Sequence, residues 1–157
     1  MKPYSKNYPK SYQKEKRILS KLGKFKIHHV GSTAVPGIIG KGWIDILIIA
    51  KNKKQREDLI KKLEKKGYKK AKTRRKERIF LSKLKNAQRY NLHLYLKGNR
   101  KAADKTLFRD FLIKNPKEAS NYEKFKKDIL KKAKGERVAY KKLKRDYFKK
   151  IMKKIRL

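Results

Sequence analysis

Three short stretches of the sequence carry side chains that can do chemistry. Asp45 is the charged residue in the apolar run WIDILIIA, where an uncompensated carboxylate is costly, so it must be paired, hydrogen-bonded or bound to a metal. Gly31 and Ser32 follow a β-rich stretch; glycine lets the backbone approach a phosphate closely, and serine offers a hydroxyl and a backbone N–H. His93, in NLHLYL, supplies an imidazole that can act as a ligand, a base or a hydrogen-bond donor. Together these groups favour a site for an anionic ligand.

Each of these residues also has a purely structural interpretation. A buried ion pair with Lys41 or Arg78 satisfies Asp45 as well as a ligand does. The Gly31-Ser32 pair is also compatible with a plain strand-to-helix turn. His93 alternates with two leucines and so points away from them, either toward Asp45 or toward solvent. The residues alone leave both interpretations open.

The elements that must position these residues follow from the hydrophobic pattern. Period-two and continuous apolar runs predict strands, and apolar residues at helical spacing predict helices. The predicted strands are Phe25–Val30, Trp43–Ala50, Glu77–Leu84 and Tyr90–Leu96, and the predicted helices are Ser11–Leu22, Asn52–Lys66 and several from Asn99 onward. The fold class is therefore α+β, close to α/β, with a small mixed β-sheet, flanking helices and a helical C-terminal third. We expect one domain over residues 1–157, with a core at about 12–114 and C-terminal helices at 116–156.

The chain is strongly basic. Its 157 residues include 51 Lys or Arg and 13 Asp or Glu, which gives a formal net charge of +38. Nucleic acid, nucleotide phosphates and an acidic membrane face are natural counterparts of that charge. Compositional bias is the alternative, because 40 of the basic residues are lysines whereas phosphate recognition usually favours arginine. The densest basic segment, Lys69–Arg78, is either a phosphate-contacting loop or a solvated one.

The composition excludes several functional classes. The absence of cysteine excludes disulfide frameworks, Cys-ligated zinc and thiol catalysis. No apolar run approaches the length of a membrane-spanning helix, and the N-terminus lacks the apolar segment of a secretory signal. We therefore expect a cytoplasmic protein.

The stretch His28–Ile48 (HHVGSTAVPGIIGKGWIDILI) resembles the signature of the GrpB family, within the nucleotidyltransferase-fold superfamily. The family pattern is a His, then Gly-Ser-Thr-x-Val-Pro-Gly, then Lys-Pro-x-x-Asp-Ile. The matching residues are His29, Gly31, Ser32, Thr33, Val35, Pro36, Gly37, Lys41, Asp45 and Ile46. The resemblance continues over nearly the whole chain, in Arg78, Asn91–Leu94, Leu107–Leu112, Asn115-Pro116, Tyr122 and the Tyr140…Lys144 helix. It departs at Gly42, where the family usually has proline.

This resemblance implies a fold and a chemistry. Enzymes of the wider superfamily place two Asp one residue apart on a strand and a third carboxylate on a later strand. These acids hold two metal ions that orient an in-line attack on an α-phosphate. Here Asp45 matches the second Asp, Trp43 stands at the first, and His93 stands where the later acid would be. The resemblance therefore implies an incomplete carboxylate set.

The leading expectation is a nucleotidyltransferase-fold protein that binds a nucleotide or another phosphorylated ligand, with metal-dependent nucleotidyl transfer as its reaction. The resemblance implies Asp45 and His93 as catalytic residues and Mg²⁺ ligands, with a nucleoside triphosphate as substrate. The implied phosphate-binding residues are Gly31, Ser32, Thr33, Lys41, Arg78 and Arg109. One alternative is a catalytically inactive module whose basic surface binds RNA or DNA. A second is a regulatory or partner domain linked to dephospho-coenzyme A kinase, to which GrpB-like domains are fused in some proteins.

Overall fold

A computed structural model of the chain describes residues 1–73 and 76–157. Arg74 and Arg75, which belong to the basic segment singled out above, lie outside the described residues. The described chain divides into two compact units, residues 1–106 and 107–157.

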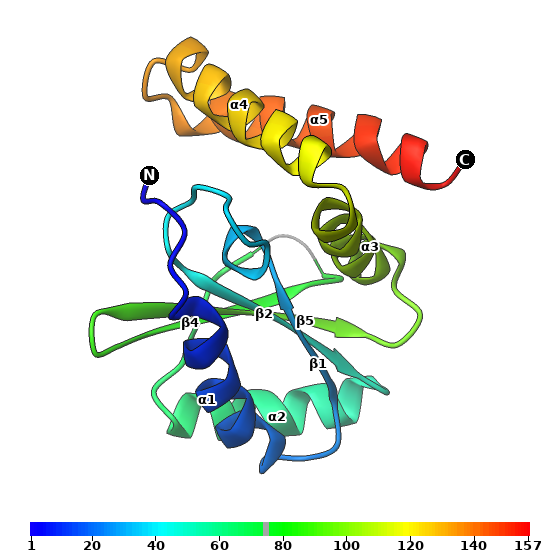
Figure 1. Ribbon diagram of the computed structural model, residues 1–157. Helices are drawn as coiled ribbons and strands as arrows, with labels where there is room; N and C mark the ends of the chain where they lie inside the picture. The colour runs from blue at the N-terminus through cyan, green and yellow to red at the C-terminus, as the bar shows by residue number, and fades with distance from the viewer. Residues whose placement is uncertain (74–75) are drawn as a thin grey trace. The chain divides into compact units, whose positions relative to one another are not determined.

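The first unit is built on a mixed β-sheet (Figure 1). Its strands are β1 (Lys26–Val30), β2 (Ile44–Ala50), β3 (Lys69–Lys70), β4 (Ile79–Lys85) and β5 (Gln88–Leu96). Their order is β1-β2-β5-β4-β3, in which β2 and β5 run parallel and the other neighbours are antiparallel. The parallel register places Asp45 beside Asn91 and Leu47 beside His93, so residues far apart in the sequence become neighbours.

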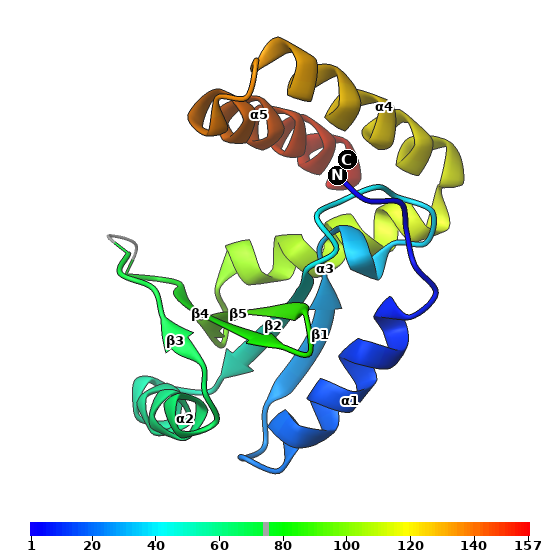
Figure 2. The ribbon, with the colours of Figure 1, turned by 90° about the vertical axis from the view of Figure 1, so that its left-hand side faces the viewer.

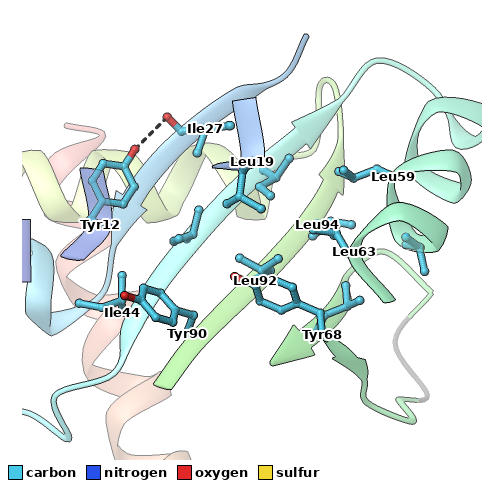
Figure 3. Close-up of a cluster of buried hydrophobic side chains, with 14 of the residues drawn as sticks. Tyr12, Leu19, Ile27, Ile44, Leu59, Leu63, Tyr68, Tyr90, Leu92 and Leu94 are labelled. Carbon is cyan, nitrogen blue, oxygen red and sulfur yellow. Dashed lines mark hydrogen bonds between the residues drawn. The ribbon is translucent and has the colours of Figure 1, made fainter. Parts of the chain in front are cut away.

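Two helices, α1 (Tyr8–Ser20) and α2 (Lys53–Lys65), cover one face of this sheet (Figure 2). The side chain of Asn52 caps α2 by accepting a hydrogen bond from the backbone N–H of Gln55 at 2.9 Å, which fixes where the helix begins. The helices and the sheet enclose a hydrophobic core whose labelled members in Figure 3 are Tyr12, Leu19, Ile27, Ile44, Leu59, Leu63, Tyr68, Tyr90, Leu92 and Leu94.

Strand alternation separates the apolar and polar residues of β2 and β5. Ile44, Ile46 and Ile48 point into the core beneath α1 and α2, so Asp45 and Leu47 lie on the opposite face. On that face Leu47 packs with Val30, Tyr95 and Ala102, the last of which lies near the start of α3 (Arg100–Lys114). Because Asn91 and His93 alternate with the core residues of β5, they share the face that carries Asp45.

A tight hairpin joins β4 to β5. Its two turn residues, Asn86 and Ala87, have φ values of 50° and 64°, which matches the right-handed twist of the flanking strands. The hairpin pairs Lys85 with Gln88 and places Phe80 beside His93. One result is that the segment leading into β4, which contains Arg78, reaches the neighbourhood of His93.

The second unit contains the end of α3 together with α4 (Pro116–Lys132) and α5 (Arg137–Ile155). Phe125 stacks on Tyr147 with ring centroids 4.1 Å apart, and the buried Tyr122 contacts Phe108 at 5.3 Å. The buried apolar residues of this unit also include Ile129, Ile151 and Met152. Within the described residues, no helix is long and apolar enough to cross a membrane.

The predicted fold class is confirmed. The long strands and helices lie within a few residues of their predicted bounds, although α1 starts at Tyr8 because Pro9 is compatible with the first turn of a helix. The two-residue strand β3 lies inside the segment that we expected to be a loop. The boundary between the two units falls within α3, before the expected start of the C-terminal helices at 116.

Candidate functional site

The carboxylate of Asp45 is the centre of a polar cluster on the sheet. Its Oδ1 atom accepts a hydrogen bond from Asn91 Nδ2 at 3.2 Å and lies 3.2 Å from His93 Nε2. The Asp45 side chain is 26% exposed and that of His93 is 10% exposed. His93 therefore points toward Asp45 rather than toward solvent, and the cluster keeps one partly open side.

The charges of the pair are set by its surroundings. Burial on its own raises the pKa of Asp45, but the hydrogen bonds from His93 and Asn91 and the positive charge of Lys105 outweigh it, so the pKa lies below its usual value. Burial lowers the pKa of His93; Lys105 and Arg78 lower it further, and Asp45 opposes them. At neutral pH Asp45 is therefore a carboxylate and His93 a neutral imidazole.

This charge state assigns the tautomer of His93. A neutral ring that faces a carboxylate carries its proton on the nitrogen that faces it, so Nε2–H donates to Asp45. The other nitrogen, Nδ1, then has a free lone pair; it is buried and has no hydrogen-bond partner among the residues that the structure describes. Such a nitrogen can accept a hydrogen bond from a ligand hydroxyl or take up its proton.

Stability is expected to fall as the pH drops below about 6.5, because His93 binds a proton in the unfolded chain at its ordinary pKa but resists it in the folded one. The contribution of neutral His93 to the free energy of unfolding is complete above that pH and declines below it by up to about 1.4 kcal/mol per pH unit. Calorimetric melting from about pH 7.5 to about pH 5.5 should show a smaller decline for His93→Gln than for the wild type. Equal declines for His93→Gln and the wild type would contradict the assignment. Asp45 acts in a separate window, below its ordinary pKa of 3.8.

Phe80 lies between Arg78 and the imidazole of His93 and contacts both. The guanidinium carbon of Arg78 lies 5.6 Å from the centroid of the Phe80 ring, and that ring meets His93 edge-on at 5.3 Å. The half-buried Arg78 has an Nε atom that is shielded from solvent and, among the described residues, has no hydrogen-bond partner. A guanidinium with an unsatisfied donor beside a polar cluster is suited to an anionic group.

Two further cations lie at the start of β2. The guanidinium of Arg89 and the ammonium of Lys41 are each 4.6 Å from the centroid of the Trp43 indole. Arg89 Nε also donates to Asn91 Oδ1 at 2.9 Å, which orients the amide so that its NH₂ group faces Asp45. Trp43 therefore replaces the acid expected at this position with a ring that holds positive charge.

Position 31 requires glycine, because of its backbone conformation and because it lies close to the Asp45 side chain. Its φ of 78° and ψ of −174° belong to a region that essentially only glycine adopts. A Cβ atom at this position would lie 2.6 Å from Asp45 Oδ2. Ser32 then begins a single 3₁₀ turn, η1 (Ser32–Ala34), which is too short to supply a substantial helix dipole.

Thr33 has a structural role in this turn. Its buried hydroxyl donates to the backbone carbonyl of Trp43 at 3.0 Å and lies 2.9 Å from His29 Nε2. His29 stacks on Tyr12 of α1 with ring centroids 4.6 Å apart. These contacts hold the Gly31 turn against the start of β2, so the predicted phosphate-binding role of Thr33 has a competing explanation.

Arg109 belongs to the second unit. Its Nη2 and Nε atoms lie 2.8 and 2.9 Å from Asp110 Oδ1, so the guanidinium is paired with the next residue of α3. A role for Arg109 in phosphate binding stays a prediction.

The donor set was compared with the two Mg²⁺ ions that the fold family implies. The described residues contain no group of three His, Cys, Asp or Glu side chains able to hold a metal ion. Mg²⁺ usually keeps several waters and binds through one or two carboxylates together with substrate phosphates. Asp45 fits a Mg²⁺ ion brought by a nucleotide, but this donor set does not fit a protein-held pair of ions.

Sequence reasoning did not single out Arg89 or Lys105. Arg89, Asn91 and His93 alternate along β5 and therefore share a face, so the period of two was the available signal for Arg89. Lys105 is one of many helical lysines, and nothing in its sequence context distinguishes it.

The mixed sheet and its covering helices form an α+β fold with the polar cluster on one face of the sheet. The family model described as GrpB protein matches residues 1–154, and the chain therefore belongs to the GrpB family.

Curated relatives and solved structures agree with this assignment. UPF0157 protein BH1888 of Halalkalibacterium halodurans is 33% identical over 80% of this chain, and UPF0157 protein SCO7215 of Streptomyces coelicolor is 27% identical over 80%. The chain spans 66% of the length of BH1888 and 67% of that of SCO7215. The crystal structure of the conserved protein GrpB from Enterococcus faecalis matches with a TM-score of 0.76 and 24% identity over 96% of this chain and 98% of that one. A Cid1 poly(U) polymerase bound to MgATP matches with a TM-score of 0.50 and 11% identity over 70% of this chain and 38% of that one, so it bears on the fold alone.

Proposed function

We propose that the chain binds a nucleotide or another phosphorylated ligand at the cluster formed by Asp45, Asn91 and His93. The observation that supports this proposal most strongly is a pair of buried nitrogens that have no hydrogen-bond partner among the described residues, Nε of Arg78 and Nδ1 of the neighbouring His93. A phosphorylated ligand with a hydroxyl group offers a partner for each: an anionic oxygen for the donor and an O–H for the acceptor.

The electrostatics of the cluster support an anion. His93 is neutral, so Asp45 contributes the negative charge, and Lys105 and Arg78 act on the pair as positive charges. Lys41 and Arg89 add two cations at Trp43. The site has more positive than negative groups, although Asp45 would repel a phosphate placed directly against it.

A Mg²⁺ ion would remove the repulsion between Asp45 and a phosphate. A Mg²⁺ ion that arrives with a nucleotide and contacts Asp45 would convert that repulsion into attraction. When bound, such an ion would polarise the phosphate oxygens. The residues of the chain would then orient the ligand, with Arg78 neutralising a phosphate oxygen and His93 Nδ1 accepting a proton from an attacking hydroxyl.

The binding of ATP to the full chain, measured by isothermal titration calorimetry, tests the proposal. Arg78→Gln is expected to weaken binding by roughly tenfold or more, because it removes a charge-assisted hydrogen bond. Lys85→Gln is the matched control, since it removes the same charge from an exposed residue at the end of β4. No measurable binding by the wild type, or equal weakening by both variants, would show that ATP does not bind at this cluster.

Asp45→Asn tests the role of Mg²⁺ separately. With EDTA the variant should bind ATP more tightly than the wild type, because a like charge is removed. With Mg²⁺ it should bind ATP more weakly, because the carboxylate ligand is lost. The same change under both conditions would rule out a Mg²⁺ ion shared by Asp45 and the nucleotide. The proposed link to dephospho-coenzyme A kinase stays a prediction, testable by co-purification of the two proteins.

A further inference from the structure

A basic groove of 640 Å³ lies in the first unit, away from the Asp45 cluster. Its lining comes from α2, from the edge strand β3 with the three residues that follow it, and from Lys76 and the first residue of β4. Its lining residues are Arg56, Lys70, Ala71, Lys72, Thr73, Lys76 and Ile79. Four of the seven are cationic and none is acidic. Ile79 packs against the core beneath α1 and α2, so the groove opens beside the face opposite to Asp45.

Arg56 is the residue that distinguishes this groove from an ordinary basic surface. Its side chain is 8% exposed, and its Nε atom has no hydrogen-bond partner in the part of the chain that the structure describes. The Oε1 atom of Glu57 lies 4.0 Å from that nitrogen, on a side chain that is 56% exposed, so solvent screens the pair. Burying a guanidinium without a close counter-charge is unfavourable. An anion in the groove would supply the missing partner.

Protection of the sheet edge explains only some of the cationic residues that line the groove. Lysines on an edge strand prevent pairing with another chain, and β3 is an edge strand that carries Lys69 and Lys70. That explanation does not extend to Arg56, which lies on α2 and is buried.

We propose that this groove binds the phosphodiester backbone of single-stranded nucleic acid. Its cations come from three separate places, the helix α2, the strand β3 and the segment before β4, and such a spread matches a repeated charge better than one phosphate. Lys70, Lys72 and Lys76 are exposed at the rim, where they can follow a flexible backbone, and Arg56 provides a fixed anchor. A chain with a net charge of +38 gains strongly from releasing the counterions of a polyanion. This proposal is independent of ligand binding at Asp45.

Filter binding of a labelled 12-nucleotide RNA, and of DNA of the same sequence, to the full chain tests the proposal between about 50 and 200 mM salt. Replacing Lys70, Lys72 and Lys76 together by glutamine should lower affinity at least tenfold. It should also reduce the slope of log K against log salt by about 2, which corresponds to three contacts with a single strand. The matched control replaces Lys10, Lys14 and Lys21, which are exposed on or just after α1, and removes the same total charge. Equal losses in the two triple variants would overturn the proposal, because they would show binding through overall charge alone.

Arg56→Gln provides a second, independent measurement. It should weaken RNA binding roughly tenfold and leave the melting temperature of the free protein unchanged or raised, because it removes a buried charge without a close partner. A lower melting temperature with unchanged affinity would assign Arg56 a purely structural role and overturn the proposal. If ATP saturates the groove as tightly as the oligonucleotide does, the groove is a small-anion site and the proposal fails.

Discussion

Replacing Gly31 by alanine is expected to destabilise the protein by roughly 3 kcal/mol, which corresponds to a fall in melting temperature of roughly 6–12 °C for a chain of this size. Two effects combine. The backbone at φ 78° and ψ −174° is strained for any residue with a Cβ atom, and that atom would lie 2.6 Å from Asp45 Oδ2. Either the carboxylate moves away from His93 or the turn shifts, so ligand binding at the cluster should also be lost. Calorimetric melting measures the first effect and ATP titration the second.

Gly37 offers the matched control for this substitution. It also has a positive φ, 84°, but an added Cβ atom would have no heavy atom within 4 Å among those that the structure describes. Gly37→Ala therefore isolates backbone strain and should cost about 1 kcal/mol. In an Asp45→Ala background the cost of Gly31→Ala should shrink, because the clashing oxygen is gone. An unchanged cost there would show that contact with the carboxylate does not make glycine necessary.

Replacing Tyr68 by phenylalanine is expected to destabilise the protein by about 2–3 kcal/mol, or roughly 4–12 °C in melting temperature. The Tyr68 hydroxyl donates to Glu15 Oε1 at 2.6 Å, and the Glu15 residue, on α1, is 2% exposed. Burial and the hydrogen bond to Glu15 raise the pKa of Tyr68 far above its ordinary value, so the hydroxyl keeps its proton and remains a donor. Its removal leaves a buried carboxyl group without this partner, which is more costly than the loss of a hydrogen bond alone.

Two controls separate the charge-assisted contact from simple loss of a hydroxyl. Tyr12→Phe removes a hydroxyl that donates to a neutral acceptor, the backbone carbonyl of Ile27, at 3.3 Å (Figure 3), and should cost about 1 kcal/mol. Glu15→Met combined with Tyr68→Phe replaces both partners by apolar groups and should recover most of the lost stability. Equal costs for Tyr12→Phe and Tyr68→Phe would show that the carboxyl group of Glu15 is satisfied without Tyr68.

Most elements of the fold could be predicted because their sequence patterns are strong. The run that becomes β2 is almost entirely apolar and is buried on both faces, and α2 combines apolar residues at helical spacing with the cap at Asn52. β3 could not be predicted, because Lys69 and Lys70 join the sheet through backbone pairing with Leu81 and Ser82 and carry no apolar side chain. Its strand character depends on a neighbour, not on its own residues.

The candidate site could be predicted only in part. Asp45 was identifiable because a charge in an apolar strand needs a partner, and the parallel pairing of β2 with β5 supplies two, Asn91 and His93. The sequence offered Lys41 and Arg78 as ion-pair partners, since it does not specify which strand lies beside β2. The close approach between Gly31 and Asp45 was equally inaccessible, because it depends on a distance across the turn.

The position of Trp43 allows its fluorescence to report changes near Asp45. It is the chain's single tryptophan, two residues before Asp45, and the positive groups of Lys41 and Arg89 each lie 4.6 Å from the centroid of its ring. Indole emission responds to nearby charge, so an anion that draws either cation away from the ring would change the colour and intensity of the emitted light. The unlabelled protein can therefore report occupancy of its own site in an ordinary fluorimeter, against a background of tyrosine that can be avoided by exciting at longer wavelength.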